Sequence, residues 1–595
     1  CTRARLASGI APVAQLLRLD LLGVPLARPQ SAKATSANGG TGLNHEDEAD
    51  AMGEAPRGPP PLANGRNVQP PPAPPHLAEP SIAPARPASG GPPPLPPIPA
   101  TPTLRADLDN PDQLVPLPPS AAFSDWTGLF GAQAAQPAAP PAAPAADEEA
   151  RPDDLPLSVL LDENSSNASS ILAGRELKAR KRPITLNRDV LKRHAAVLGG
   201  SGSGKTTLAL SLIEQLLLRG VPAILIDRKG DLCSYANPEV WRHIDDEWGE
   251  RRGDREKLAD AIDVAVYTPG RSSGRPISIT LLPNGIGELP EHEQQLLANM
   301  SAAALGDMLH LKNSAMHQKQ SGTLSVALKI LGSRYKREVM LADLIHLLED
   351  EDPELTDLTQ RMDPSGRVRR DLVAQLDSLR HRNAVLFEGG GEPMRMEAFL
   401  GLGSFARLNR TRLSIIYTGF LGDNENILFW VSQFLSEALR FCQRNPNDAL
   451  QAVVMLDEAD LYIPANAKPA TAEPLQSLLK RARSAGLGIM LATQSPGDLD
   501  YKSRDQITSW FIGRVREDTA LRKLKAAFQS ESGLDPAAVL PHQTVGEFHL
   551  VQEGFVRPMK AQRSLINAEQ VPFDRIEQLA YETKGQDERQ LKLFK

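Results

Sequence analysis

The residues from Gly199 to Thr206 read Gly-Gly-Ser-Gly-Ser-Gly-Lys-Thr, which fits the pattern GxxxxGKT. Glycines in such a loop allow a tight turn and bring backbone N–H groups close to phosphate oxygens. Lys205 would neutralise the transferred phosphate, Thr206 would bind Mg²⁺ through its hydroxyl, and Thr207 would lie near the α-phosphate. The sequence therefore predicts a site for a nucleotide and Mg²⁺ that is formed by Gly199, Gly200, Ser201, Gly202, Ser203, Gly204, Lys205, Thr206 and Thr207.

Two acids, Asp457 and Glu458, follow the apolar run 452–456. A strand that ends in this way is the expected form of a Walker B element. Its aspartate can hold Mg²⁺ through water, and its glutamate can position and polarise the attacking water. Gln494 ends a later apolar run, where it would hydrogen-bond the γ-phosphate or the water. Together with Lys205, these residues predict hydrolysis of the bound nucleotide.

Phosphoryl transfer also needs positive charge on the side of the phosphate that faces away from Lys205. An arginine from the same chain or from a neighbouring subunit is the usual source of this charge. The candidates are Arg481, Arg483, Arg514 and Arg516. The local pattern does not rank them.

The elements that must position these residues alternate along the chain. Apolar runs predict strands at 195–198, 222–226, 413–417, 452–456, 487–492 and 509–513, with a terminal β element over 546–558. Helical patterns such as 208–218 and 426–442 lie between them. This alternation predicts an α/β fold with a mostly parallel sheet that is covered on both faces. Apolar positions at helical spacing predict a helical insertion over about 240–390.

The first part of the chain has a different composition. More than half of the 51 prolines lie between Ala51 and Leu160, and such a stretch cannot bury enough apolar surface to offset its chain entropy. We expect a remnant helix over 1–28, a disordered Pro/Ala/Gly-rich linker over 29–154 and a P-loop domain over 155–595. The alternative for the linker is a docking site for a domain that reads polyproline.

Charge and cysteine content narrow the class of protein. A formal net charge of −7 gives no global basic signature, so any nucleic-acid surface must be local. The three cysteines are scattered without a CxxC pair, which argues against structural zinc and disulfides and favours a reducing cytoplasm. No apolar run is long enough for a membrane helix. Because the chain begins with Cys rather than Met, we expect a fragment or a processed product that lacks an upstream domain.

A set of motifs occurs in a recognisable order: Arg193-His194, GGSGSGKTT (199–207), Asp227-x-Lys-Gly-Asp231, LDEADLYIP (456–464), Arg481-Ala-Arg483-Ser-Ala-Gly and LATQSP (491–496). The set resembles the HerA-FtsK superfamily, and most closely its HerA-like branch, over about 172–566. The resemblance implies a RecA-like core, a homo-hexameric ring, and the use of ATP and Mg²⁺ to pump double-stranded DNA through the central channel.

The same resemblance implies roles for three further residues. Arg483 matches the family's arginine that reaches the γ-phosphate of a neighbouring subunit, although Ala482 replaces the usual glycine before it. Arg193 and Asp227 match family positions near the nucleotide. HerA-like proteins usually carry an N-terminal β-barrel where this chain has its proline-rich stretch, so pairing with a nuclease through such a barrel does not follow.

Two other functions fit parts of the sequence. A secretion or conjugation ATPase would share the motifs, but it usually adds membrane helices. A nucleotide-switched interaction module would use the proline-rich stretch to recruit partners and hydrolysis to reset its state. The complete set of Asp457, Glu458, Gln494 and Arg483 favours a working motor.

Overall fold

The computed structural model describes residues 157, 169–178, 181–242, 246–312, 314–387 and 390–593. All of them belong to the compact unit Gly131–Lys595, which is distinct from the unit Cys1–Phe130. The expected helix over 1–28 and the expected linker over 29–154 therefore lie outside the described residues.

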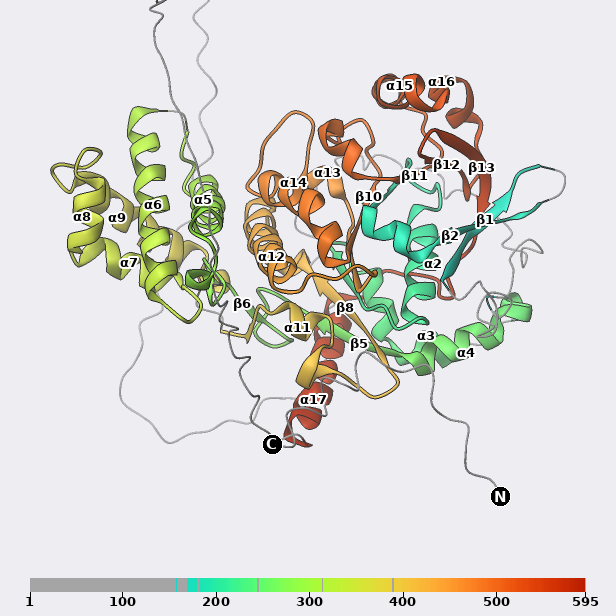
Figure 1. The fold of residues 1–595 in the computed structure, drawn as a ribbon. Coiled ribbons are helices and arrows are strands. Elements are labelled where there is room, and N and C mark those ends of the chain that lie inside the picture. Colours follow the sequence, from blue (N-terminus) through green and yellow to red (C-terminus); the bar gives the residue numbers. More distant parts are fainter. Residues whose placement is uncertain are drawn as a thin grey trace, which may run out of the picture. The chain divides into compact units, whose positions relative to one another are not determined.

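A sheet of 11 strands forms the centre of the described chain, in the order β2-β1-β13-β12-β11-β3-β10-β9-β4-β8-β5 (Figure 1). Every neighbouring pair from β11 to β5 is parallel, and every pair from β11 to β2 is antiparallel. The bounds are β1 Ser170–Glu176, β2 Pro183–Asn187, β3 Ala195–Leu198, β4 Ala223–Asp227, β5 Ile262–Tyr267, β8 Thr411–Tyr417, β9 Ala452–Leu456, β10 Leu487–Thr493, β11 Ser509–Ile512, β12 Glu547–Gln552 and β13 Phe555–Ala561. The predicted mostly parallel sheet is thus confirmed.

Helices cover both faces of the parallel strands, which is why these strands read as continuous apolar runs. In β3, Ala195 and Val197 pack in the hydrophobic cluster that contains α2 (Lys205–Leu217). Ala196 and Leu198 point the other way, into the cluster that contains α12 (Asn424–Arg444) and α14 (Ala472–Arg481). The twofold alternation along the strand therefore joins two apolar cores through one sheet.

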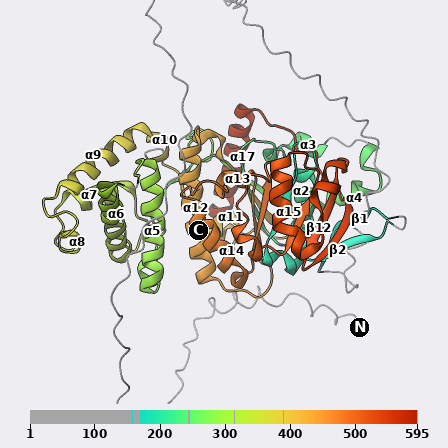
Figure 2. The same cartoon turned by 90° about the horizontal axis from the view of Figure 1, so that it is seen from above.

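The predicted helical insertion is present but shorter than 240–390. Its helices are α5 Glu291–Met308, α6 Ala315–Arg334, α7 Leu341–Glu349, α8 Pro353–Thr359 and α9 Arg367–Arg382. The strand β5, at Ile262–Tyr267, lies inside the predicted span but pairs with β8 at the edge of the sheet. It was missed because a short apolar run cannot be distinguished from a helical segment by periodicity alone, and its partner β8 is distant in the sequence. Helix α12 lies between α5 and the sheet in both Figure 1 and Figure 2, and it packs against α5.

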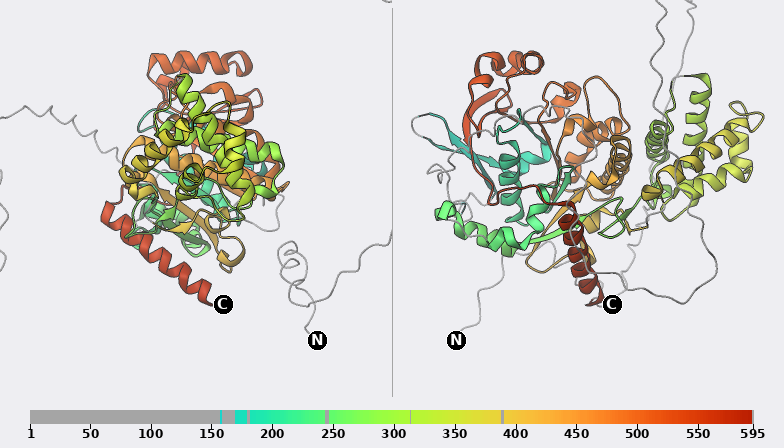
Figure 3. Two further views of the ribbon diagram at one scale, coloured as in Figure 1. Left: turned by 90° about the vertical axis from the view of Figure 1, so that its left-hand side faces the viewer. Right: turned by 180° about the vertical axis from the view of Figure 1, so that it is seen from behind.

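The C-terminal helix α17 (Phe573–Leu593) packs against β5 and was not predicted (Figure 3). Buried charges anchor it: a carboxylate oxygen of Asp587 lies 2.7 Å from Arg275, and the same carboxylate lies 2.9 Å from Arg412. Burial alone would raise the pKa of Asp587, but hydrogen bonds from these arginines and their charges lower it to about 2. Other elements that the sequence did not predict are β1, β2 and α15 (Asp518–Ser532). Within the described ranges, no helix is both long and apolar enough to span a bilayer.

Candidate nucleotide site

The glycine-rich loop joins the carboxyl end of β3 to the first residue of α2, as the sequence predicts. Gly202 and Gly204 have φ values of 66° and 91°, which a residue with a Cβ rarely adopts. A Cβ at Gly204 would also lie 3.3 Å from the Cα of Gly546. Gly200 N–H donates to the carbonyl of Arg514 (2.8 Å), and Gly199 N–H donates to that of Thr493 (3.3 Å). The loop is thereby tied to the ends of β11 and β10.

Lys205 is the first residue of α2 and is buried. Its ammonium donates to the carbonyl oxygen of Gly200 (3.2 Å). Burial lowers the pKa of Lys205 to about 8, and the charge of Asp457 partly opposes this shift. No side chain among the described residues caps the start of α2, so its first N–H groups are available to an acceptor. A buried cation beside an uncapped helix start fits a phosphate group.

Asp457 follows β9 directly and is 4% exposed. Burial raises its pKa to about 6, and the charge of Lys229 partly opposes the shift. With the hydroxyl of Thr206, its carboxylate would supply oxygen ligands of the kind that Mg²⁺ prefers. The described residues contain no group of three or more His, Cys, Asp or Glu side chains that could hold a metal alone.

Glu458 occupies a left-handed conformation with φ 55° and ψ 48°. Its carboxylate forms ion pairs with Arg228 (3.2 Å) and Lys229 (3.0 Å). Neither cation was predicted as a site residue, although both lie in the segment Asp227-Arg-Lys-Gly-Asp231. The signal that could have identified them is their position directly after β4, a strand that ends at the edge of the sheet where the loop lies.

Asp227 is fully buried at the end of β4. Its carboxylate accepts the backbone N–H groups of Lys229 (2.9 Å), Gly230 (2.9 Å) and Leu232 (3.1 Å). Burial and the charge of Asp231 raise its pKa to about 7. Asp227 thus shapes the turn that carries Arg228 and Lys229. A direct contact between Asp227 and the nucleotide stays a prediction.

Two more candidates lie at the same edge of the sheet as the loop. Gln494 follows β10 and is half-buried. Arg514 follows β11, and its Nη2 lies 4.0 Å from the position that a Cβ on Gly202 would take. Arg516 is exposed two residues further on. Among the four candidate arginines, Arg514 is therefore the one that lies beside the loop of its own chain.

Arg193 and Arg483 lie at the opposite edge. Arg193 ends the 3₁₀ helix Arg188–Arg193 before β3, and it forms an ion pair with Glu553. Arg483 is exposed in the 3₁₀ helix Ala482–Ala485 before β10. The seven residues of β10 span about 23 Å, so Arg483 cannot reach the loop of its own chain. Arg193 is likewise not brought to that loop. Arg481 pairs with Glu293 (3.5 Å).

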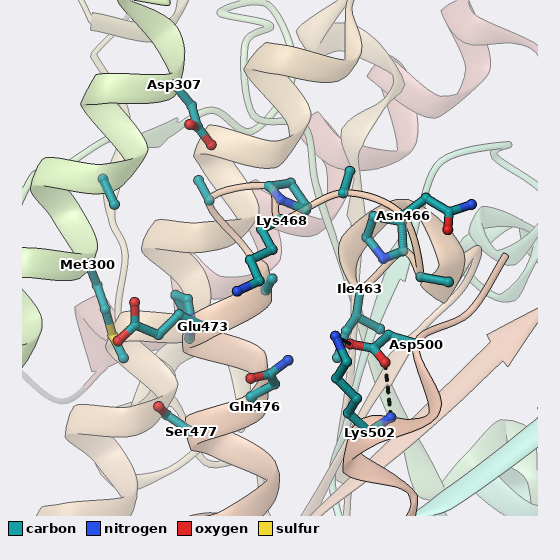
Figure 4. A pocket seen from close by; sticks show the side chains of 18 of the residues that line it. Met300, Asp307, Ile463, Asn466, Lys468, Glu473, Gln476, Ser477, Asp500 and Lys502 are labelled. Carbon is teal, nitrogen blue, oxygen red and sulfur yellow. Dashed lines mark hydrogen bonds and ion pairs between the residues drawn. The ribbon is translucent and has the colours of Figure 1, made fainter. Parts of the chain in front are cut away.

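A separate cavity of about 710 Å³ lies between α5, α14 and the loop after α13 (Ala459–Tyr462) (Figure 4). Its charged lining consists of three lysines and three acids, namely Lys468, Lys480, Lys502, Asp307, Glu473 and Asp500. Asp500 and Lys502 form an ion pair there (3.9 Å). None of the described residues that line it belongs to the predicted nucleotide site, and its balanced charges do not favour a phosphate.

Residues 171–396 match the family model of the helicase HerA central domain, named DUF87. The matched span includes the glycine-rich loop, the turn after β4 and the helical segment α5–α9. No curated protein sequence matches the chain.

Several solved structures are similar to parts of this chain. VirB4 of Thermoanaerobacter pseudethanolicus is 15% identical with a TM-score of 0.43, over 68% of this chain and 98% of that protein. The plasmid coupling protein TrwB in complex with ADP and Mg²⁺ is 12% identical with a TM-score of 0.43, over 70% of this chain and 95% of TrwB. The genome packaging NTPase B204 from Sulfolobus turreted icosahedral virus 2 is 21% identical with a TM-score of 0.20, over 25% of this chain and 68% of B204.

Proposed function

We propose that the chain is a P-loop ATPase that works as a homo-hexameric ring motor. The support is the match of residues 171–396 to the HerA central domain and the mostly parallel sheet that carries the glycine-rich loop. The motor uses ATP and Mg²⁺ to move or remodel double-stranded DNA. Support for a nucleic-acid substrate comes from the helicase family that matches residues 171–396. A nuclease or another partner protein would direct the motor to its substrate.

The proposed roles follow the edges of the sheet. Backbone N–H groups of 199–207 and the ammonium of Lys205 bind the phosphates, while Thr206 and Asp457 hold Mg²⁺, which offsets the phosphate charge. Glu458 accepts a proton from the attacking water as its oxygen bonds to the γ-phosphorus and the bond to the β-phosphate oxygen breaks. Gln494 orients that water, and Arg514 adds positive charge from the same chain.

The position of Arg483 is the observation that best supports assembly into a ring of subunits. Its exposed side chain begins at the edge that faces away from the loop, so it can serve only the nucleotide of another subunit. A trans arginine of this kind couples hydrolysis to assembly. Arg193 lies at the same edge, and we propose that it also faces the neighbouring subunit.

The proposed domain extent is 155–595, with the proline-rich stretch as a tether or docking segment. We place the protein in the cytoplasm, because the thiols of Cys233 and Cys442 are free and buried among the described residues. Such thiols are typical of a reducing compartment.

The test is the rate of ATP hydrolysis with and without duplex DNA, measured over a range of protein concentrations. We expect duplex DNA to raise kcat and the rate per chain to rise with assembly, whereas Glu458→Gln lowers kcat about 100-fold or more. Electron microscopy of the same sample should show closed rings. Hydrolysis by an isolated monomer that ignores every form of DNA would overturn the motor, and turnover near zero with all nucleic acids would favour a nucleotide switch.

A further inference from the structure

The carboxylate of Glu458 is held by two cations from another strand end. Arg228 Nη1 lies 3.2 Å from Glu458 Oε2, and Lys229 Nζ lies 3.0 Å from Glu458 Oε1. Both cations belong to the turn after β4, and β4 is the neighbour of β9 in the sheet. Each oxygen of the proposed water-activating group therefore faces a positive charge.

The backbone of Glu458 lies in the left-handed region, which a residue with a Cβ rarely adopts and which persists only where the surroundings hold it. The Glu458 side chain is 21% exposed. Its two ion pairs, with Arg228 and Lys229, therefore lie in a locally constrained turn.

The two cations differ in what else they touch. Burial disfavours the charge on Lys229, but its hydrogen bond to Glu458 and the nearby carboxylates of Asp457 and Asp231 outweigh this and raise its pKa. Lys229 thus belongs to the cluster around the phosphates. Arg228 reaches away from that cluster, since its Nη2 donates to Asn424 Oδ1 (2.8 Å).

Asn424 is the first residue of α12, and α12 packs against α5 of the helical segment. The planar guanidinium of Arg228 therefore bridges Glu458 and α12 with two donors in a fixed fork. A shift at the start of α12 would move Asn424 and, with it, the guanidinium of Arg228. That movement would break the ion pair between Arg228 and Glu458.

We propose that Arg228 is a positioning residue that holds Glu458 in a resting position and makes its release depend on α12. The inference rests on the proposed function, because that function assigns the proton-accepting role to Glu458. The attacking water must compete with Arg228 for Oε2, so hydrolysis without DNA is slow until the pair opens. Stimulation by DNA is then, in part, the opening of this pair.

The experiment measures kcat and KM for ATP, with and without duplex DNA, on the full chain. Arg228→Ala should raise the DNA-free kcat about threefold or more, which corresponds to a barrier lowered by at least about 0.65 kcal/mol. Its KM and its affinity for a fluorescent ATP analogue should stay within about twofold, since Arg228 does not hold the phosphates. Stimulation by DNA should shrink. Arg228→Lys should give an intermediate kcat, because one ammonium cannot bridge Glu458 and Asn424.

Asn424→Ala tests the same link without touching Glu458. It should raise the DNA-free kcat in the same direction by a smaller factor, and it serves if Arg228→Ala fails to fold. The matched control is Arg252→Ala, because Arg252 is an exposed arginine paired only along its own helix with Glu256. An unchanged or lower DNA-free kcat in both Arg228→Ala and Asn424→Ala, at a normal melting temperature, would overturn the proposal. Equal rates for the wild type and Glu458→Gln would instead overturn the proposed function itself.

Discussion

The two edges of the parallel sheet differ in what they carry. At the carboxyl edge, Lys205 and Asp457 are buried and Glu458 is half-buried. The amino edge carries Arg483, which is exposed, and Arg193, which is half-buried and paired with Glu553. One edge is thus a preorganised phosphate site, and the other presents cations that have no phosphate within reach in the same chain.

In the proposed ring, this difference means that a complete hydrolytic site would need two copies of the chain. The carboxyl edge can bind the nucleotide alone, because the loop and its lysine come from one strand and one helix. The final positive charge would come from the amino edge of a neighbour. Binding and hydrolysis should therefore be separable by substitution, and the largest effects should fall on the carboxyl edge.

The strongest test of the carboxyl edge is Lys205→Ala. Removing the buried ammonium should weaken ATP binding about 100-fold or more, as measured by titration with a fluorescent analogue. Burial lowers the pKa of Lys205 to about 8, and phosphate binds the protonated form. The affinity of the wild type for ATP should therefore fall as the pH rises above about 8. The affinity of Lys205→Ala for ATP should not show this fall. Lys336→Ala, at an exposed lysine of the helical segment, is the control. If Lys205→Ala bound ATP with full affinity, the glycine-rich loop would not be part of the ATP-binding site.

The amino edge is tested by mixing two inactive variants. Arg483→Ala should lower kcat about 100-fold or more while leaving nucleotide affinity within about threefold. In rings mixed at equal amounts with Glu458→Gln, about a quarter of the interfaces would pair an intact Glu458 with an intact Arg483. Activity should therefore return to a substantial fraction of the wild-type rate. A mixture as inactive as its components would show that both residues act on the nucleotide of one chain.

The smallest expected effect is on the stability of the fold rather than on nucleotide binding or hydrolysis. Glu214 of α2 is fully buried, accepts hydrogen bonds from Tyr235 (2.6 Å) and Leu565 N–H (2.7 Å), and has a pKa raised by burial to about 7. The folded protein keeps this proton to higher pH than the unfolded chain, so the stability contributed at low pH is lost as the pH rises from about 4.5 to about 7. Glu214→Gln should therefore be more stable than the wild type at pH 8 by on the order of 2–3 kcal/mol.

At pH 5, where the wild-type carboxyl is protonated, Glu214→Gln should differ little from the wild type. Thermal melts at the two pH values measure this contrast, and ATP affinity should not change in either. Glu239→Gln, at an exposed glutamate, should show no such dependence on pH. A variant that is less stable than the wild type at pH 8 would mean that Glu214 is needed in its charged form.

Much of the fold could be predicted because the central strands are buried on both faces. The runs at β3 and β9 match their predicted bounds, and β4, β8, β10 and β11 match within two residues. The strands β1, β2 and β5 were not predicted. β1 pairs with β13 and β5 pairs with β8, so partners that are distant in the sequence hold them in the sheet. The helix α17 was missed because the charges that anchor it, Arg275 and Arg412, lie far from it in the sequence.

The sequence by itself determined that the chain binds a nucleotide, because the loop, its lysine and the start of α2 are contiguous and local sterics require its glycines. It also determined the order of the strands along the chain. Only the tertiary structure decided that Arg514 lies beside the loop, that Arg193 and Arg483 face away from it, and that Arg228 holds Glu458. These facts depend on which strand ends meet across the sheet and at which edge, and strand pairing over hundreds of residues is fixed by packing rather than by local pattern.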